Sequence, residues 1–142
     1  MESEIVRFTI TILPESSGTV TQLSRHGLRN TNVLEHTPGV RNCVIVWIRQ
    51  RTPLAEVEEF FKTMRFRHMT VTELCIVKKD HSILLKSGPV ATLSLMPGVD
   101  NRFPSFLPEN KHITLWPVEK VMENCWKEGW GFAGVELNTT SP

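Results

Sequence analysis

The sequence predicts an α+β domain, in which strands form antiparallel sheets and helices flank them. Three observations support this class: an alternating apolar stretch at residues 5–13, a nearly continuous apolar run at residues 43–48, and an apolar stripe of helical spacing at residues 54–64. The expected order is a strand, then strand–helix–strand–strand–strand, then strand–helix–strand. Directly consecutive strands with short connections favour antiparallel pairing over a doubly wound parallel sheet.

The first two strands follow from different apolar patterns. Residues 5–13 place Phe8, Ile10 and Ile12 on one side of a strand, because successive side chains alternate between faces. Residues 43–48 read Cys-Val-Ile-Val-Trp-Ile, which is typical of a strand buried on both faces. The stretch 19–39 between them is polar and has no sustained period, so no element is assigned there.

A helix follows the second strand. Thr52 suits the N-cap and Pro53 the first helical position, where its missing N–H costs nothing. The residues that then recur at helical spacing form one apolar stripe: Leu54, Val57, Phe60, Phe61 and Met64. The sequence therefore predicts an amphipathic helix with one face against the sheet.

The middle of the chain predicts a group of strands. Residues 69–77 are rich in Thr, Val and Ile, as strands are. Residues 78–81 form a polar turn, and residues 82–86 return as a hairpin partner. Another strand is expected at residues 90–95. Residues 97–108 contain three prolines and a glycine, so they are expected to form an ordered loop.

The last third predicts a strand, a helix and a strand. Residues 112–115 suit a short strand. From Pro117 a second helix is expected to end near Gly129, with one face formed by Val118, Val121, Met122 and Cys125. Residues 132–137 suit a final strand.

The composition argues against some classes of protein. The 142 residues are 40% hydrophobic and 22% charged, which fits one globular domain over residues 1–142, as a whole protein or as part of a longer one. The net charge of +1 argues against a broad basic surface for duplex nucleic acid, but it allows a local anion site. No apolar run approaches the roughly 18 residues of a membrane span. The acidic start Met-Glu-Ser-Glu-Ile is unlike a signal peptide, so a cytoplasmic protein is expected.

The cysteines support the same localisation. Cys43, Cys75 and Cys125 lie far apart and form no Cys-x-x-Cys pair, which argues against a disulfide framework and against a zinc site. Each is expected to be a small buried side chain in a reducing compartment. The sequence therefore predicts no metal and no cofactor.

One short motif carries chemistry. The residues His112-Ile113-Thr114-Leu115 place His112 and Thr114 two apart on a strand, so both side chains point the same way. A histidine can transfer a proton at a phosphate near neutral pH, and a threonine hydroxyl can donate a hydrogen bond to a phosphoryl oxygen. Two such pairs facing each other would supply a base, an acid and two phosphate donors, so they could cleave a phosphate ester without a metal ion. The alternative for an isolated His-x-Thr is a surface strand with a half-exposed histidine.

This motif resembles the second His-x-Thr motif of the 2H phosphoesterases. The likeness is closest to the 2′,3′-cyclic-nucleotide 3′-phosphodiesterase branch, which includes the RNA-ligase cyclic phosphodiesterase domains. In that branch the first motif often follows a Pro-Gly-Val turn and reads His-Cys-Thr; residues 38–44 here read Pro-Gly-Val-Arg-Asn-Cys-Val. The likeness covers about residues 39–123. It implies a two-lobed, pseudo-symmetric fold with antiparallel sheets, flanking helices and a cleft.

The chain departs from the family at the first motif. Asn42 stands where the family has its first catalytic histidine, and Val44 stands where it has the threonine. Asparagine is no general base at neutral pH and valine has no hydroxyl, so a loss of about 10²–10⁴-fold in rate is expected. The resemblance therefore implies a weakened or inactive relative that binds a nucleotide, an RNA end with a terminal phosphate, or a protein partner. In this interpretation Asn42 and His112 lie on adjacent central strands and face one cleft.

A second His-x-Thr at His68-Met69-Thr70 leaves an alternative open. With His112 it would give an active phosphodiesterase on 2′,3′-cyclic or 2′,5′-linked substrates. The family's motif spacing is closer to that between Asn42 and His112, and the hairpin expected after His68 leaves no room for the family's helix. His68 is otherwise an exposed residue in the basic run 65–68. A third alternative is an unrelated α+β protein that carries His-Ile-Thr-Leu by chance.

Three residues near the motifs are candidates for substrate binding. Trp116 directly follows the second motif and could stack a base or belong to the core. Arg41 and Lys111 each precede a motif position and could attract an anion, although cations at strand ends are common. Trp47 is expected to point with Ile45 away from the motif side chains and into the core.

Overall fold

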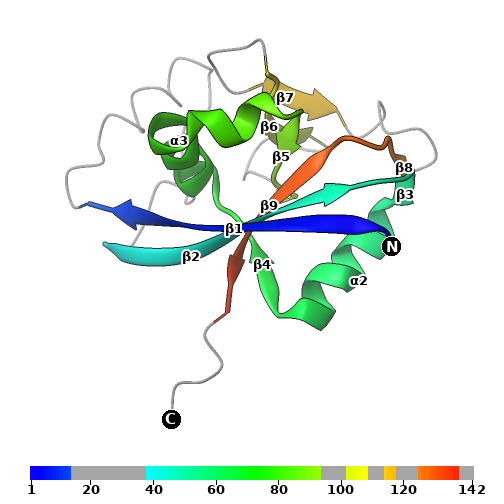
Figure 1. Ribbon diagram of the computed structural model, residues 1–142, viewed down its shortest axis with the longest axis horizontal. Helices are drawn as coiled ribbons and strands as arrows, with labels where there is room; N and C mark the ends of the chain where they lie inside the picture. The colour runs from blue at the N-terminus through cyan, green and yellow to red at the C-terminus, as the bar shows by residue number, and fades with distance from the viewer. Residues whose placement is uncertain (14–37, 94–101, 109–113, 118–124, 138–142) are drawn as a thin grey trace.

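The computed structural model describes residues 1–13, 38–93, 102–108, 114–117 and 125–137. Within these ranges the main sheet has seven strands: β1 (Ser3–Ile12), β2 (Gly39–Ile48), β4 (Phe66–His68), β5 (Val90–Ala91), β6 (Arg102–Phe106), β7 (Thr114–Pro117) and β9 (Gly131–Glu136). A second sheet pairs β3 (Thr52–Pro53) with β8 (Cys125–Trp126). The helices are α2 (Leu54–Met64), α3 (Val71–Asp80) and the short 3₁₀ helix η2 (Ser82–Lys86). Figure 1 shows α2 and α3 on opposite sides of β1 and β2.

The sheet is mostly antiparallel, which confirms the predicted α+β class. Its strand order is β1-β2-β9-β5-β6-β7, and β5 with β9 is the parallel pair among the described strands. One edge of β9 is shared by two partners. Its beginning pairs with β5 at Gly131 and Phe132, whereas its end pairs with β4, where Gly134 lies opposite His68. On its other edge Gly134 pairs with Val44.

β2 is buried on both faces, as its apolar run predicts. Cys43 and Ile45 belong to the core cluster on the α3 side, together with Leu74. Val44 and Val46 belong to the cluster on the α2 side. The strands expected at residues 5–13 and 132–137 are also confirmed, as β1 and β9.

The helix predicted from the 54–64 stripe is confirmed, but its start differs from the prediction. The N-cap is Pro53, with φ −62° and ψ 147°, and not Thr52. Thr52 lies in β3 and its hydroxyl donates to the carbonyl oxygen of Gln50 at 2.8 Å. Val57 and Phe61 are the buried side chains of α2. The helix ends at Arg65, which adopts a left-handed conformation with φ 59°.

The strand predicted at residues 69–77 is wrong, because this segment forms α3. A capping box starts the helix: the Thr70 hydroxyl oxygen accepts from the Glu73 backbone N–H at 3.2 Å, and the Glu73 carboxylate accepts from the Thr70 N–H at 2.9 Å. All residues from Val71 to Val77 are buried. Because this part of the helix is buried on every side, it has no polar face, and its sequence lacks the apolar stripe that identifies α2.

Three other predictions need correction. Residues 82–86 form η2 and not a hairpin strand. Part of the loop expected at residues 97–108 is the strand β6, which pairs with β5 and β7. The helix expected from Pro117 does not extend through Cys125 to Gly129, because Cys125 begins β8; residues 118–124 lie outside the described residues.

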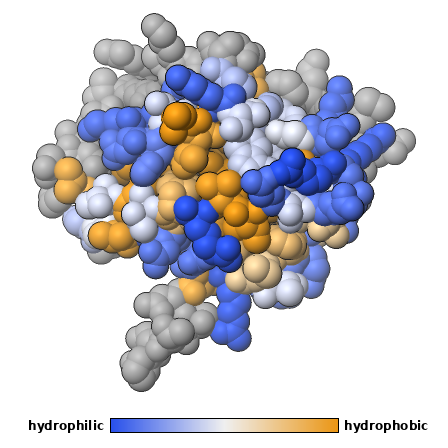
Figure 2. Space-filling view, viewed as in Figure 1, coloured by the Kyte–Doolittle hydropathy of each residue, from blue (hydrophilic) through white to orange (hydrophobic). Residues whose placement is uncertain are grey.

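Hydrophobic side chains also reach the surface. Figure 2 shows them over β1 and near α3, bordered by hydrophilic residues. Among the described residues, the large hydrophobic side chains that are exposed are Leu13, Val40, Met64, Ile83 and Leu137. In the part of the chain that the structure describes, no helix is long and apolar enough to cross a membrane.

Candidate functional site

His68 lies on the face of the sheet that α2 covers. It is the last residue of β4 and lies opposite Gly134 of β9, which in turn lies opposite Val44 of β2. Paired residues of antiparallel strands point to the same face, so His68 and Val44 both point toward α2. The sheet therefore brings His68 against a helix that precedes it in the chain.

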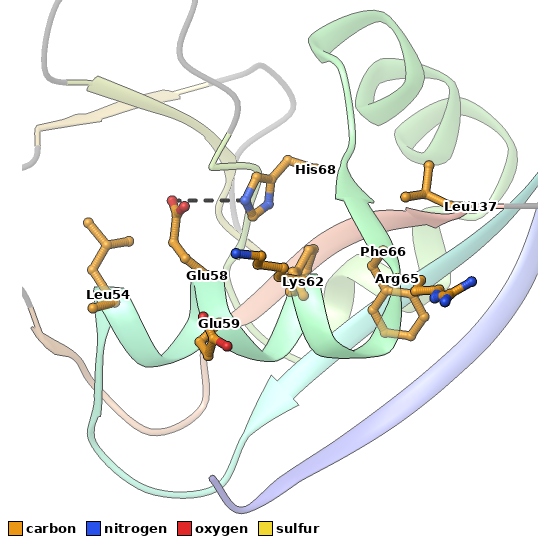
Figure 3. Close-up of a pocket in the computed structure, with 10 residues that line it drawn as sticks. Leu54, Glu58, Glu59, Lys62, Arg65, Phe66, His68 and Leu137 are labelled. Carbon is orange, nitrogen blue, oxygen red and sulfur yellow. Dashed lines mark ion pairs between the residues drawn. The ribbon is translucent and has the colours of Figure 1, made fainter. Parts of the chain in front are cut away.

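The imidazole of His68 is held by contacts with α2. It stacks on the Phe61 ring with a centroid distance of 4.7 Å and an interplanar angle of 27°. Its Nε2 atom lies 3.9 Å from Oε1 of Glu58, as Figure 3 shows. Its Nδ1 atom is buried and has no hydrogen-bond partner among the described residues. One ring nitrogen thus faces a carboxylate, while the other is sealed from water.

This environment keeps His68 neutral at pH 7. Burial lowers the pKa of His68 below its ordinary value of 6.5, because desolvation disfavours the charged imidazolium. The charge of Glu58 acts in the opposite direction and raises that pKa.

A groove of about 770 Å³ opens beside His68. Its charged lining comes mainly from the exposed face of α2, with Glu58, Glu59 and Lys62, and from Arg65. Its apolar lining comes from Leu54, Phe61, Phe66 and Leu137. Figure 3 shows the side chain of Glu58 extending from α2 toward His68. The groove therefore offers hydrogen-bond donors and acceptors next to an apolar wall.

Gly134 makes this stacking possible. A Cβ atom at Gly134 would lie 2.7 Å from Cε2 of Phe61 and 3.0 Å from the carbonyl oxygen of Arg67. The first distance is shorter than real Cβ contacts and the second is tighter than most of them, so glycine lets the Phe61 ring lie this close to β9. The position of Phe61 in turn sets the position of the His68 ring.

The two first-motif positions differ in exposure. Asn42 is exposed on β2, opposite Thr9 of β1. Val44 has an exposed fraction of 0% and packs in the core cluster that includes α2. The Val44 side chain, which the sequence resemblance aligns with the threonine of the first motif, is thus packed under α2 and does not face solvent.

The described part of the second motif lies at the far end of the sheet. Thr114 of β7 is paired with Ser105, and Trp116 with Phe103. β7 is separated from β2 by β9, β5 and β6. The expectation that the two motif strands are adjacent is therefore wrong for β2 and β7. His112 and Lys111 lie outside the described residues.

Arg41 points to the α3 side of β2, opposite to Asn42. Its Nε atom lies 3.4 Å from Oε2 of Glu73. Arg67 donates to both oxygens of the same carboxylate, at 2.8 and 2.7 Å. Burial alone would raise the pKa of Glu73, but the hydrogen bonds from Arg67 and Thr70 outweigh it and hold that pKa below its ordinary value. Arg41 therefore contacts a buried carboxylate that joins α3 to the sheet.

Thr70 is the N-cap of α3. Its hydroxyl oxygen accepts from the Glu73 N–H, as an N-cap does. The hairpin expected after His68 is absent and α3 follows instead, so one argument against His68 as a motif residue no longer applies. The hydroxyl of this second His-x-Thr, however, serves the helix and not the groove.

Sequence reasoning missed the residues that surround His68. Glu58 and Lys62 lie four positions apart on α2, a spacing that places both side chains on one helix face. This spacing is visible in the sequence, but the strand β4, which brings His68 to that helix face, is not. Within the described residues, no three His, Cys, Asp or Glu side chains form a group that could hold a metal ion. Burial raises the pKa of Cys43 to about 12, so its thiol is unreactive at neutral pH.

No protein-family model, curated protein or solved structure matches this chain.

Proposed function

We propose that the protein is a binding domain of the 2H phosphoesterase type that has lost catalysis. In this proposal the α+β fold is a two-lobed 2H frame, and its ligand is a nucleotide or an RNA end with a terminal phosphate. The observation that carries the loss of catalysis is the state of the first motif. Asn42 supplies no general base, and Val44 is fully buried under α2 with no hydroxyl.

The groove beside His68 is the proposed ligand site. Lys62 and Arg65 are exposed cations that can bind a phosphate. Glu58 and Glu59 accept hydrogen bonds only, which suits the hydroxyl groups of a ribose. The apolar wall with Leu54 suits the face of a base. A nucleotide combines an anion, hydroxyl donors and an apolar ring, so it matches this mixed lining better than a free phosphate does.

The active phosphodiesterase that pairs His68 with His112 is less well supported. The Nδ1 atom of His68 is sealed from solvent, and its Nε2 atom faces Glu58. A general base needs a free ring nitrogen within reach of the substrate. We therefore treat turnover as an outcome that would contradict the proposal. A protein partner in the groove is a further outcome of the same test.

The test is a calorimetric titration of the wild-type protein with a 3′-nucleoside monophosphate and with the matching nucleoside. We expect the nucleotide to bind and the nucleoside to bind at least about 10-fold more weakly, because the phosphate contacts are lost. Lys62→Ala should weaken nucleotide binding on the order of 10-fold. Lys79→Ala removes an exposed lysine of α3 and should have no effect, which makes it the matched control.

Two results would overturn the proposal. Equal binding of nucleoside and nucleotide, or an unchanged affinity in Lys62→Ala, would exclude the groove as a phosphate site. Rapid hydrolysis of a 2′,3′-cyclic nucleotide that disappears in His112→Ala would show an active enzyme instead.

A further inference from the structure

Trp47 lies on the face of β2 that is opposite to the His68 groove. It belongs to the residues packed against the α3-side cluster, and it is paired with Gly131 of β9. A Cβ atom at Gly131 would lie 2.8 Å from both Cε3 and Cζ3 of the indole, and one at Gly88 would lie 3.2 Å from Cζ3. The indole therefore lies directly against two stretches of glycine backbone. The sequence expectation that Trp47 is simply core is incomplete, because its ring is only partly buried.

A cavity of about 450 Å³ opens beside this ring. Its lining includes Trp47, Val6, Glu4, Arg49, Ser87 and Glu128. Arg49 forms an ion pair with Glu4. The cavity thus has one aromatic wall and a rim with two carboxylates, one guanidinium and one hydroxyl.

Glu128 is held at this rim by the backbone. The N–H of Gly129 donates to the carbonyl oxygen of Ile48 at 3.0 Å, and the N–H of Ile48 donates to the carbonyl oxygen of Trp130 at 3.0 Å. Gly129 has φ 92°, a conformation that glycine adopts without strain. The turn is therefore fixed to the end of β2, next to Trp47.

The lining defines the chemistry of a ligand. An indole can stack on the flat ring of any nucleobase. Carboxylates accept hydrogen bonds and cannot donate them, whereas a guanidinium only donates. The matching ligand is a flat ring that carries N–H donors on its edge and an anionic or carbonyl group nearby. Adenine, cytosine and guanine carry an exocyclic amino group, whereas the single N–H of uracil lies between two carbonyl groups that a carboxylate repels.

We propose that the cavity beside Trp47 binds an amino-bearing nucleobase, with the base stacked on the indole and its amino group donating to Glu128. The pair of Glu4 and Arg49 contacts the attached ribose and phosphate. These residues lie on the opposite face of the sheet from the His68 groove, so the site can exist whether or not that groove binds a phosphate.

The test follows the indole N–H resonance of Trp47 by NMR, assigned by its absence in Trp47→Phe. Titration with CMP should shift this resonance, and UMP should bind about 10-fold more weakly, because it lacks the amino donor. Glu128→Gln should abolish the preference for CMP over UMP. Lys127→Ala changes the neighbouring exposed residue and should leave that preference intact.

Several outcomes would overturn this proposal. Equal affinity for CMP and UMP, an unchanged preference in Glu128→Gln, or no shift of the Trp47 resonance would each exclude a base site. Displacement of CMP by methyl glucoside would identify a sugar site instead. Lys62→Ala, which tests the His68 groove, should not alter the Trp47 response, so failure of one site is distinguishable from failure of the other.

Discussion

His68 shows how much the surroundings of one residue decide about its chemistry. In the sequence it is a histidine in a basic run, and surface exposure is the simplest expectation. In the structure it stacks on Phe61, faces Glu58 and has a sealed Nδ1 atom. Burial makes it a neutral side chain with one accessible polar atom. This arrangement suits the binding of a ligand better than the transfer of protons.

The pKa of His68 predicts a pH dependence of stability. Because its folded pKa lies below the ordinary value of 6.5, the unfolded chain takes up the proton first as the pH falls. The wild-type free energy of unfolding should therefore decrease relative to that of His68→Gln as the pH falls through about 6.5. Urea unfolding of both proteins at about pH 7.5 and about pH 5.5 measures this difference.

Glu58→Gln provides the control for this prediction. The charge of Glu58 raises the pKa of His68, so its removal should make the acid destabilisation larger. Parallel pH profiles of the wild type and His68→Gln would show that His68 is not buried as described.

At the scale of elements, α3 depends on its N-terminus and on one buried ion cluster. Its capping box joins Thr70 to Glu73, and the same Glu73 carboxylate binds Arg67 and lies near Arg41. Glu73 is only 2% exposed. The helix start and the attachment of the helix to β2 and β4 therefore depend on one carboxylate.

Substitutions at this helix start should differ in severity. Thr70→Ala should cost about 1 kcal/mol, the usual loss for an N-cap. Glu73→Ala should cost more, about 1.5–3 kcal/mol, because it removes the charge-assisted hydrogen bonds from Arg67 to the buried carboxylate. Thr63→Ala on the exposed side of α2 should change stability by less than about 0.5 kcal/mol. Denaturant midpoints rank the three variants, and an equal effect of Thr70→Ala and Glu73→Ala would contradict the role of the ion cluster.

At the scale of the whole molecule, the sheet separates the two proposed motif strands. Three strands lie between β2 and β7, and α2 covers the Val44 side of β2. A restored first motif would thus place its threonine hydroxyl inside a core. The loss of catalysis in the proposed function follows from this packing as well as from the two substitutions.

The double variant Asn42→His with Val44→Thr tests this architecture. Asn42→His should be nearly neutral because the residue is exposed, whereas Val44→Thr should cost about 1–3 kcal/mol for a buried hydroxyl without an acceptor. We expect a folded double variant, as judged by circular dichroism, with no hydrolysis of 2′,3′-cyclic nucleotides. Activity that appears in this variant and vanishes when His112→Ala is added would show that the motif strands do meet in a cleft.

The elements with a clear local pattern were determined by the sequence itself. β1, β2, β9 and α2 each bury one or two well-defined faces, so their apolar periods identify them without knowledge of their neighbours. α3 and β6 were misassigned for the opposite reason. The first two turns of α3, Val71–Val77, are buried on every side and show no period. The proline of β6, Pro104, hides a strand that its two neighbours hold in place.

Only the tertiary structure decided the candidate sites. The His68 groove forms because β4 pairs with the edge of β9 that faces away from β2, which brings His68 against α2. The Trp47 cavity forms because glycines of distant segments meet one indole. The sequence contains each of these residues, but its local patterns carry no information on which strands pair. A site that depends on strand pairing is therefore set by long-range packing, whereas a strand or helix with its own periodic face is set by the chain around it.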